Sequence, residues 1–251
     1  TAVMSKNNKP GDFFPLRVDY EERFYAAGKI LGSRFVRRET RPSEDAILAG
    51  RIIDRVIRPL FDYRMRREVQ VVVTVLAYDG AHDPELPGLL GASLVLAMSD
   101  VPWNGPAAGV SAVLTENGIE FGFSRVALEG KATKGEAFVA GPKGHVSMIE
   151  VGANEISEEK AMELFEKAQG EIDRLIDFQA GIVKELGKPK AEVELSVPDE
   201  EFRKKVDTFI DGKLEAAIYV GDKVEYRNKI SEVKMALLEH LEAEGLKDKI
   251  S

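Results

Sequence analysis

Arginine is the residue type whose number and spacing in this chain indicate a binding chemistry. Residues 34–67 contain ten arginines, five acidic residues and no lysine, whereas the whole chain has a net charge of −8. A guanidinium group is planar and forked, so it can bind phosphate or carboxylate through two parallel hydrogen bonds. The segment therefore predicts an anion-binding surface, without indicating which anion binds there.

The loop at residues 35–39 places an aromatic ring beside cations. Phe35 is followed by Arg37 and Arg38, and the nearest acid is Glu39. Such a combination suits single-stranded nucleic acid, because a base can stack on the ring while cations contact phosphates. The alternative is that the two arginines brace the loop through Glu39. We favour anion binding, since functional residues are concentrated in loops.

A helix is predicted to begin directly after this loop. In the segment PSED at 42–45, Ser43 can cap free backbone N–H groups and the two acids suit the positive end of the helix dipole. The expected apolar side consists of Ile47, Leu48, Ile52, Ile53 and Val56.

Three arginines should form one stripe on that helix, because their spacing is i, i+4 and i+7: Arg51, Arg55 and Arg58. For this stripe we favour structural salt bridges over ligand binding. The expected partners are Asp54, Glu44 and Asp45.

The composition predicts a globular protein of a reducing compartment. Hydrophobic residues make up 44% of the 251 residues, which is ample for a packed core. The chain has no cysteine, which excludes disulfides and thiolate metal sites and favours a cytoplasmic location. Its three histidines are scattered, and no apolar run approaches the length of a membrane helix.

The order of the expected elements favours an α+β fold, since most strands precede most helices. Strands are predicted at 13–20, 69–78, 105–113, 119–123, 138–141 and 146–151, with a hairpin turn at Asn117-Gly118. A buried helix is predicted at 86–98 and a long amphipathic helix after Ser157, with its apolar stripe broken by Gln179. Three further helices are predicted at 199–210, 213–220 and 223–244.

Long ordered motifs make the chain resemble the first half of bacterial polynucleotide phosphorylase. They are DFFPLRVDYEERFYAAGKI at 12–30, RRE-x-RPSEDAIL at 37–48, IIDRVIRPLF at 52–61, EVQVVVTVL at 68–76 and GASLVLAMSDVPWNGP at 91–106. The resemblance weakens between residues 107 and 145 and returns over 146–251.

The resemblance implies a part of a phosphate-dependent 3′-to-5′ exoribonuclease that releases nucleoside diphosphates. Residues 1–190 would form the first of two RNase PH-like core domains, a mixed sheet covered by helices. Its opening strands would be missing, which makes the chain an N-terminally truncated fragment. Residues 198–251 would form the small all-α domain that links the cores. The implied partners are single-stranded RNA and, for the full-length protein, two further copies in a homotrimer.

The resemblance also implies that this half is not catalytic. The family's active core binds phosphate, its co-substrate, in a serine-rich turn, and that turn falls on Asp83-Pro84-Glu85 here. The family's metal-binding aspartates fall on Glu136 and Gly130, and its lysine falls on Phe138. Acids repel phosphate, and one carboxylate is too few for a metal site. We therefore predict no catalytic or metal-binding residue, and place Mg²⁺ in the second core of the full-length protein.

The resemblance assigns RNA binding to the arginine-rich loop. The predicted contact residues are Phe35, Arg37, Arg38 and Arg41. The main hypothesis is that this half guides single-stranded RNA and assembles the ring. A stand-alone RNA-binding or scaffolding protein is the alternative, and an independently active single-core ribonuclease is a third possibility that Asp83-Pro84-Glu85 argues against.

Overall fold

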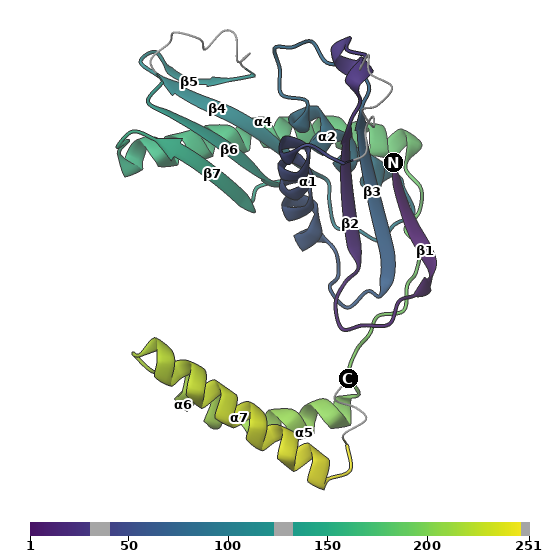
Figure 1. The fold of residues 1–251 in the computed structure, drawn as a ribbon, viewed down its shortest axis with the longest axis vertical. Coiled ribbons are helices and arrows are strands. Elements are labelled where there is room, and N and C mark those ends of the chain that lie inside the picture. Colours follow the sequence, from purple (N-terminus) through teal and green to yellow (C-terminus); the bar gives the residue numbers. More distant parts are fainter. Residues whose placement is uncertain (31–40, 123–132, 247–251) are drawn as a thin grey trace. The chain divides into compact units, whose positions relative to one another are not determined.

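The computed structural model describes residues 1–30, 41–122 and 133–246, and Figure 1 shows their arrangement. The chain divides into two compact units, Thr1–Leu195 and Ser196–Ser251. The first unit contains both sheets and the second is made of helices, so the predicted α+β class is confirmed. Among the described residues, no helix is long and apolar enough to span a membrane.

The first sheet is mixed, with strand order β1-β3-β2. Its strands are β1 (Ala2–Asn8), β2 (Leu16–Glu22) and β3 (Arg67–Val75). The central strand β3 runs antiparallel to β1 and parallel to β2. The strand that we predicted at 13–20 begins later, after Pro15, and Phe13 is 67% exposed. The strand predicted at 69–78 is also shifted, since it ends at Val75.

Helix α1 (Glu44–Ile57) lies between the parallel strands in sequence, as Figure 1 shows. Its predicted cap is confirmed, because the backbone N–H of Ala46 donates to the Ser43 Oγ atom at 3.0 Å. The predicted apolar side is wrong for Ile47 and Leu48, which are more than half exposed. The residues that are buried follow a different helical stripe: Ala46, Ala49, Gly50, Ile53, Val56 and Ile57.

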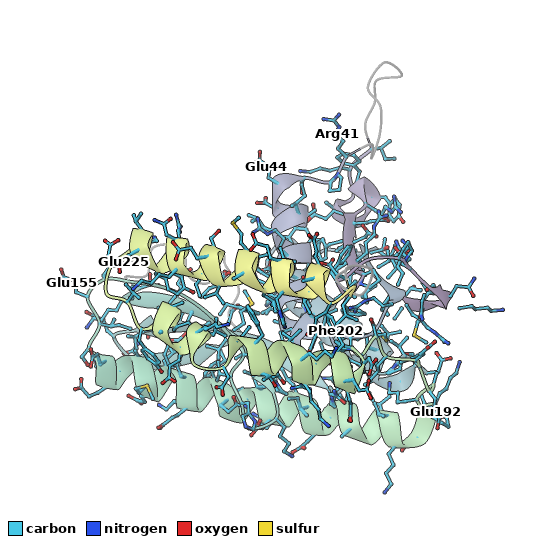
Figure 2. All side chains as sticks on the ribbon, turned by 90° about the horizontal axis from the view of Figure 1, so that it is seen from below. Arg41, Glu44, Glu155, Glu192, Phe202 and Glu225 are labelled. Atoms are coloured by element: carbon cyan, nitrogen blue, oxygen red, sulfur yellow. The ribbon has the colours of Figure 1, made fainter. Side chains whose placement is uncertain are left out.

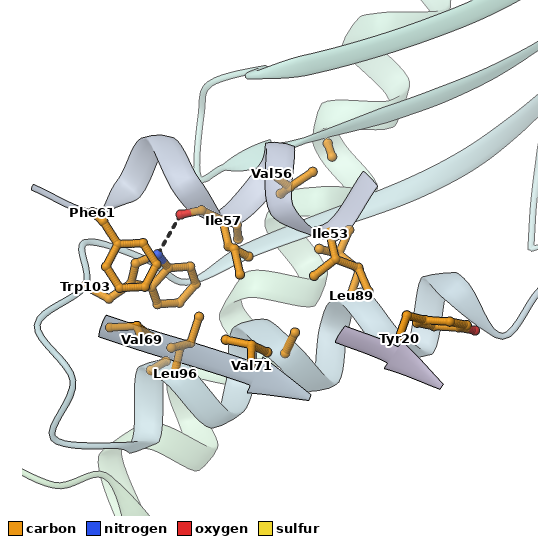
Figure 3. Close-up of a cluster of buried hydrophobic side chains, with 14 of the residues drawn as sticks. Tyr20, Ile53, Val56, Ile57, Phe61, Val69, Val71, Leu89, Leu96 and Trp103 are labelled. Carbon is orange, nitrogen blue, oxygen red and sulfur yellow. Dashed lines mark hydrogen bonds between the residues drawn. The ribbon is translucent and has the colours of Figure 1, made fainter. Parts of the chain in front are cut away.

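The first core cluster lies between α1, β3 and α2 (Glu85–Met98), and Figure 3 shows its packing. Its largest fully buried members include Ile53, Ile57, Leu89 and Leu96. Trp103 closes one end of the cluster, where its indole Nε1–H donates to the carbonyl of Ile57 at 3.0 Å. This bond satisfies a carbonyl at the C-terminal end of α1, where no further helical turn can pair with it. A short 3₁₀ turn, η2 (Arg58–Leu60), follows.

The second sheet is antiparallel, with strand order β5-β4-β6-β7. Its strands are β4 (Ala107–Thr115), β5 (Gly118–Phe121), β6 (Gly135–Pro142) and β7 (Met148–Ala153). The predicted hairpin is confirmed, since Thr115 pairs with Gly118 across the turn. Gly118 has a φ of 120°, a conformation that side chains rarely adopt.

Helix α4 (Glu158–Leu186) covers this second sheet, and the predicted Ser157 cap is confirmed. Gln179 was expected to break the apolar stripe, but it is fully buried and continues that stripe. Its amide Nε2 donates to the Ala107 carbonyl at 2.9 Å, and its Oε1 accepts from Ser93 Oγ at 2.7 Å. The Ala107 N–H in turn donates to Ser93 Oγ at 2.9 Å. The Gln179 amide supplies a donor for the Ala107 carbonyl that Pro142, opposite it in β6, cannot supply because it has no N–H.

The second unit confirms the three predicted C-terminal helices. They are α5 (Glu200–Ile210), α6 (Lys213–Ile218) and α7 (Lys223–Ala243). Aromatic and charged groups join them: the rings of Phe209 and His240 stack at 4.6 Å, and Lys213 Nζ lies 3.5 Å from the centre of the Phe209 ring. Lys205 and Glu244 form an ion pair at 2.7 Å.

Candidate functional site

A cleft of about 1040 Å³ lies in the first unit, where the parallel strands β2 and β3 end. Glu22 and Val75, the last residues of these strands, both line it. The walls come from α1, from the start of α2 and from the 3₁₀ turn η1 (Phe24–Ala27). Ligands of sheets with parallel strands are commonly bound at this carboxyl edge, because loops and helix ends meet there.

Tyr20 reaches the cleft from β2 and is only 4% exposed. Its ring fits because two glycines face it. A Cβ atom on Gly50 of α1 would lie 3.5 Å from Tyr20 Cβ, and one on Gly88 of α2 would lie 3.2 Å from Tyr20 Cε2. In Figure 3 the Tyr20 hydroxyl points away from the hydrophobic cluster. That hydroxyl is buried and has no hydrogen-bond partner within the described part of the chain.

The surroundings of Tyr20 keep its hydroxyl neutral. Burial raises the pKa of the phenol well above its usual value, and the negative charges of Glu22, Glu85 and Asp83 raise this pKa further. A neutral phenol can both donate and accept a hydrogen bond. The cleft therefore contains a buried polar group that is available to a ligand.

The acidic segment Asp83-Pro84-Glu85 lies at the start of α2. Pro84 is the N-cap of this helix and offers no side-chain hydrogen bond, while Glu85 is its first residue. All three residues line the cleft. Two carboxylates at a helix start occupy the place where an anion would otherwise be attracted by the free N–H groups.

Of the four predicted RNA-binding residues, Arg41 is described by the structure. It is exposed beside the N-terminal end of α1, close to Glu44 in Figure 2, and it lines the cleft. Phe35, Arg37 and Arg38 lie outside the described residues.

The predicted arginine stripe on α1 divides into arginines with different surroundings. Arg58 confirms the structural interpretation, since its Nε and Nη2 atoms donate to Asp54 at 2.7 and 2.5 Å. It also donates to the Leu16 carbonyl at 3.1 Å, which ties α1 to the start of β2.

Arg55 and Arg51 lie at the cleft. We predicted that Arg55 pairs with an acid of its own helix, and this is wrong, because Arg55 pairs with Glu150 of β7 at 3.1 Å. That pair is about half exposed, so it contributes little to stability. Arg51 is exposed and forms no ion pair with any residue that the structure describes, so its predicted partner is wrong too.

The carboxylate that the resemblance placed nearest to a metal site is not part of the cleft. Glu136 is exposed on β6 and lies opposite Val113 and Gly152, and it is not among the lining residues. Gly130 lies outside the described residues. Within the described ranges, no group of three or more histidine and acidic residues is arranged to hold a metal ion.

Sequence reasoning missed Tyr20 and Glu150 as cleft residues. Tyr20 was assigned to a strand, but its position near the carboxyl end of a strand that is followed by a helix was a usable signal. Glu150 carried no such signal, because its approach to Arg55 depends on how the second sheet packs beside α1.

Comparison with known proteins first defines the class. Residues 1–102 match the family described as 3′ exoribonuclease family, domain 1, of the RNase PH type. The fold is similar to that of the crystal structure of rice (Oryza sativa) Rrp46, with a TM-score of 0.51 and 13% identity, covering 73% of this chain and 82% of that one. The first unit therefore has an RNase PH-like fold.

The sequence relatives are more specific than this fold class. The chain is 44% identical to a polyribonucleotide nucleotidyltransferase of Bacillus cereus over 244 residues, which cover 97% of this chain and 34% of that protein. It is 43% identical to the protein of the same name from Bacillus velezensis over 244 residues, which again cover 97% of this chain and 34% of that protein. The chain is therefore a homologue of polyribonucleotide nucleotidyltransferases along nearly its whole length, and it spans about a third of the length of these relatives.

Proposed function

We propose that this chain is the RNA-guiding, non-catalytic part of a phosphate-dependent 3′-to-5′ exoribonuclease. The observation that carries the proposal is the 44% identity to a polyribonucleotide nucleotidyltransferase over 97% of the chain. The chemistry would take place in a second core of the full-length protein, with phosphate as co-substrate and Mg²⁺ bound there. In that protein three copies would form a ring around single-stranded RNA.

The two acids at the start of α2, Asp83 and Glu85, support the non-catalytic role. A phosphorolytic site must hold phosphate as the attacking group next to the scissile bond. Here Asp83 and Glu85 stand at the turn that the resemblance equates with the phosphate-binding turn, and both line the cleft. Their negative charges oppose phosphate at that position.

The local positive charge supports RNA guidance. Arg41 is exposed at the start of α1, and the sequence places Arg37 and Arg38 shortly before it. An arginine-rich loop of this kind contacts the phosphate backbone and therefore binds RNA of any sequence. Threading of single-stranded RNA past such a loop needs no chemistry from this half.

The test uses one preparation of the chain and oligoadenylate, with two measurements. Incubated with RNA, phosphate and Mg²⁺, the chain should release no nucleoside diphosphate. Phosphate-dependent release that Glu136→Gln abolishes would contradict the non-catalytic role.

The second measurement is the salt dependence of RNA binding. Replacing Arg37 and Arg38 together with alanine should lower the slope of log affinity against log salt by roughly 1.4, because each lost phosphate contact removes about 0.7 for single strands. Arg174→Ala is the matched control, since Arg174 is 77% exposed on α4 and pairs with Glu171. An unchanged slope in a folded double variant would remove RNA guidance from this loop.

A further inference from the structure

The cleft at the ends of β2 and β3 contains three kinds of group whose presence is not explained by the packing of the fold. The first is the buried Tyr20 hydroxyl, which has no hydrogen-bond partner among the described residues. The second is the guanidinium of Arg51, which has no ion-pair partner among them. The third is the half-exposed aromatic ring of Tyr78, which is 43% exposed. All of these residues line the same cleft.

The unpaired hydroxyl is the strongest of these observations. A buried polar group without a partner is unfavourable, and the large majority of buried polar groups in folded proteins are paired. The close approach of Gly50 and Gly88 involves the Cβ and ring carbons of Tyr20 and not its hydroxyl. The hydroxyl is therefore placed to pair with something that enters the cleft.

The two sides of the cleft differ in charge. Helix α1 and the segment just before it contribute three arginines, Arg41, Arg51 and Arg55, and one acid, Asp45, whereas the charged lining residues at the start of α2, Asp83 and Glu85, are both acidic. A ligand that fits this division carries an anionic group toward α1 and neutral hydrogen-bonding groups toward α2. Apolar side chains such as Leu48 and Ile52 lie between the arginine positions on α1 and also face the cleft.

We propose that this cleft binds a free nucleotide, with its phosphate on Arg51 and its nucleoside in hydrogen-bond contact with the Tyr20 hydroxyl. A nucleotide joins a phosphate to a flat base that has an apolar face and polar edges. Arginine pairs with phosphate in a forked geometry, and the exposed ring of Tyr78 offers a stacking surface for a base. The volume of about 1040 Å³ is ample for such a ligand, since small-molecule pockets typically measure about 300–1,000 Å³.

This site differs from the proposed RNA path in the residues that it uses. RNA guidance was assigned to Phe35, Arg37, Arg38 and Arg41, of which Arg41 also lines the cleft, whereas the nucleotide contacts are assigned to Tyr20 and Arg51. Loss of one function should therefore leave the other in place, and the two proposals can fail separately.

The test is calorimetric titration of the full chain with adenosine 5′-monophosphate. The wild-type chain should bind it saturably, while adenosine alone and inorganic phosphate alone should each bind more weakly. Tyr20→Phe should weaken binding about five- to tenfold, the effect of one lost hydrogen bond. Arg51→Ala should weaken it at least about tenfold, because a hydrogen bond to a charged group is stronger.

Two matched variants control for indirect effects. Tyr63→Phe removes a hydroxyl from a tyrosine that is 76% exposed and does not line the cleft. Arg174→Ala removes an exposed guanidinium on α4. Both should bind the nucleotide as the wild type does. Absence of wild-type binding at millimolar nucleotide, or equal affinities for wild type, Tyr20→Phe and Arg51→Ala, would overturn the proposal.

A third arm separates a free nucleotide from the terminal nucleotide of an RNA, since both carry the same chemistry. Oligoadenylate is added to the chain saturated with adenosine 5′-monophosphate. If the cleft is a site for free nucleotide, the RNA should bind without displacing it, and Tyr20→Phe should bind RNA normally. If the RNA displaces one nucleotide for each RNA bound, and if Tyr20→Phe also binds RNA more weakly, the assignment is overturned. The cleft would then be a binding site for the end of an RNA.

Discussion

Two buried polar side chains of the first unit, Gln179 and Tyr20, illustrate opposite situations. Gln179 is fully buried between α4 and β4, and both ends of its amide have partners, Ser93 and Ala107. Tyr20 is almost as deeply buried at the cleft, yet its hydroxyl has no partner in the described part of the chain. A buried polar group whose bonds are all satisfied serves the fold, and one that is left open indicates a site for a ligand.

The arginines of α1 repeat this contrast at the surface. Arg58 holds Asp54 with two hydrogen bonds and reaches the backbone of β2, so it fixes the helix in place. Arg51, two turns earlier, lies on the cleft without an ion-pair partner among the described residues. The same residue type therefore serves the fold at the C-terminal end of α1 and is available for binding at the middle of the helix.

The largest expected effect is the loss of the buried amide. Gln179→Leu should lower the free energy of unfolding by about 3 kcal/mol, because it leaves the buried Ala107 carbonyl without a donor and the buried Ser93 O–H without an acceptor. The change in the free energy of unfolding is measured from the transition of the first unit in chemical denaturation. Glu166→Leu is the control, since this exposed position on the same helix should change stability by less than about 0.5 kcal/mol. A loss of under about 1 kcal/mol for Gln179→Leu would show that Gln179 is not structural.

A smaller effect on the free energy of unfolding is expected from the ionisation of Tyr20. The pKa of Tyr20 is raised in the fold by burial and by three carboxylates, and the unfolded chain should titrate near pH 10. Stability from this group is complete below about pH 10 and is lost as pH rises, since the unfolded state releases the proton first.

Unfolding measured at pH 9 and pH 11 tests this difference. The wild type should lose about 1 kcal/mol more than Tyr20→Phe between these values, because only the wild type carries the phenol. Other tyrosines and the lysines titrate alike in both proteins, so their effect cancels in the comparison. Equal losses in the two proteins would contradict the raised pKa.

Sequence reasoning predicted the secondary structure well where local signals were strong. The Ser43 and Ser157 caps, the Asn117-Gly118 turn and the three C-terminal helices were confirmed because each depends on a few adjacent residues. The buried side of α1 was predicted wrongly at Ile47 and Leu48, because hydrophobicity alone does not determine which side faces the sheet. The actual buried side includes Ala49 and Gly50, small residues that let the helix approach Tyr20 closely.

The candidate site was harder to predict than the fold. The arginine count indicated an anion-binding surface, but partners far apart in sequence decided which arginines are paired. Arg55 meets Glu150 through packing of the second sheet, which no local pattern encodes. Gln179 was interpreted as a polar break in α4 because its partners lie 86 and 72 residues away.

The central claim is that the Tyr20 hydroxyl is kept for a ligand and not for the fold. The most direct measurement is the free energy of unfolding of Tyr20→Phe at neutral pH without added ligand. The account predicts a value equal to the wild type or higher by up to about 1 kcal/mol, because removing a buried, unpaired hydroxyl relieves a cost. A loss of more than about 1 kcal/mol would contradict the account, since it would mean that the hydroxyl has a structural partner.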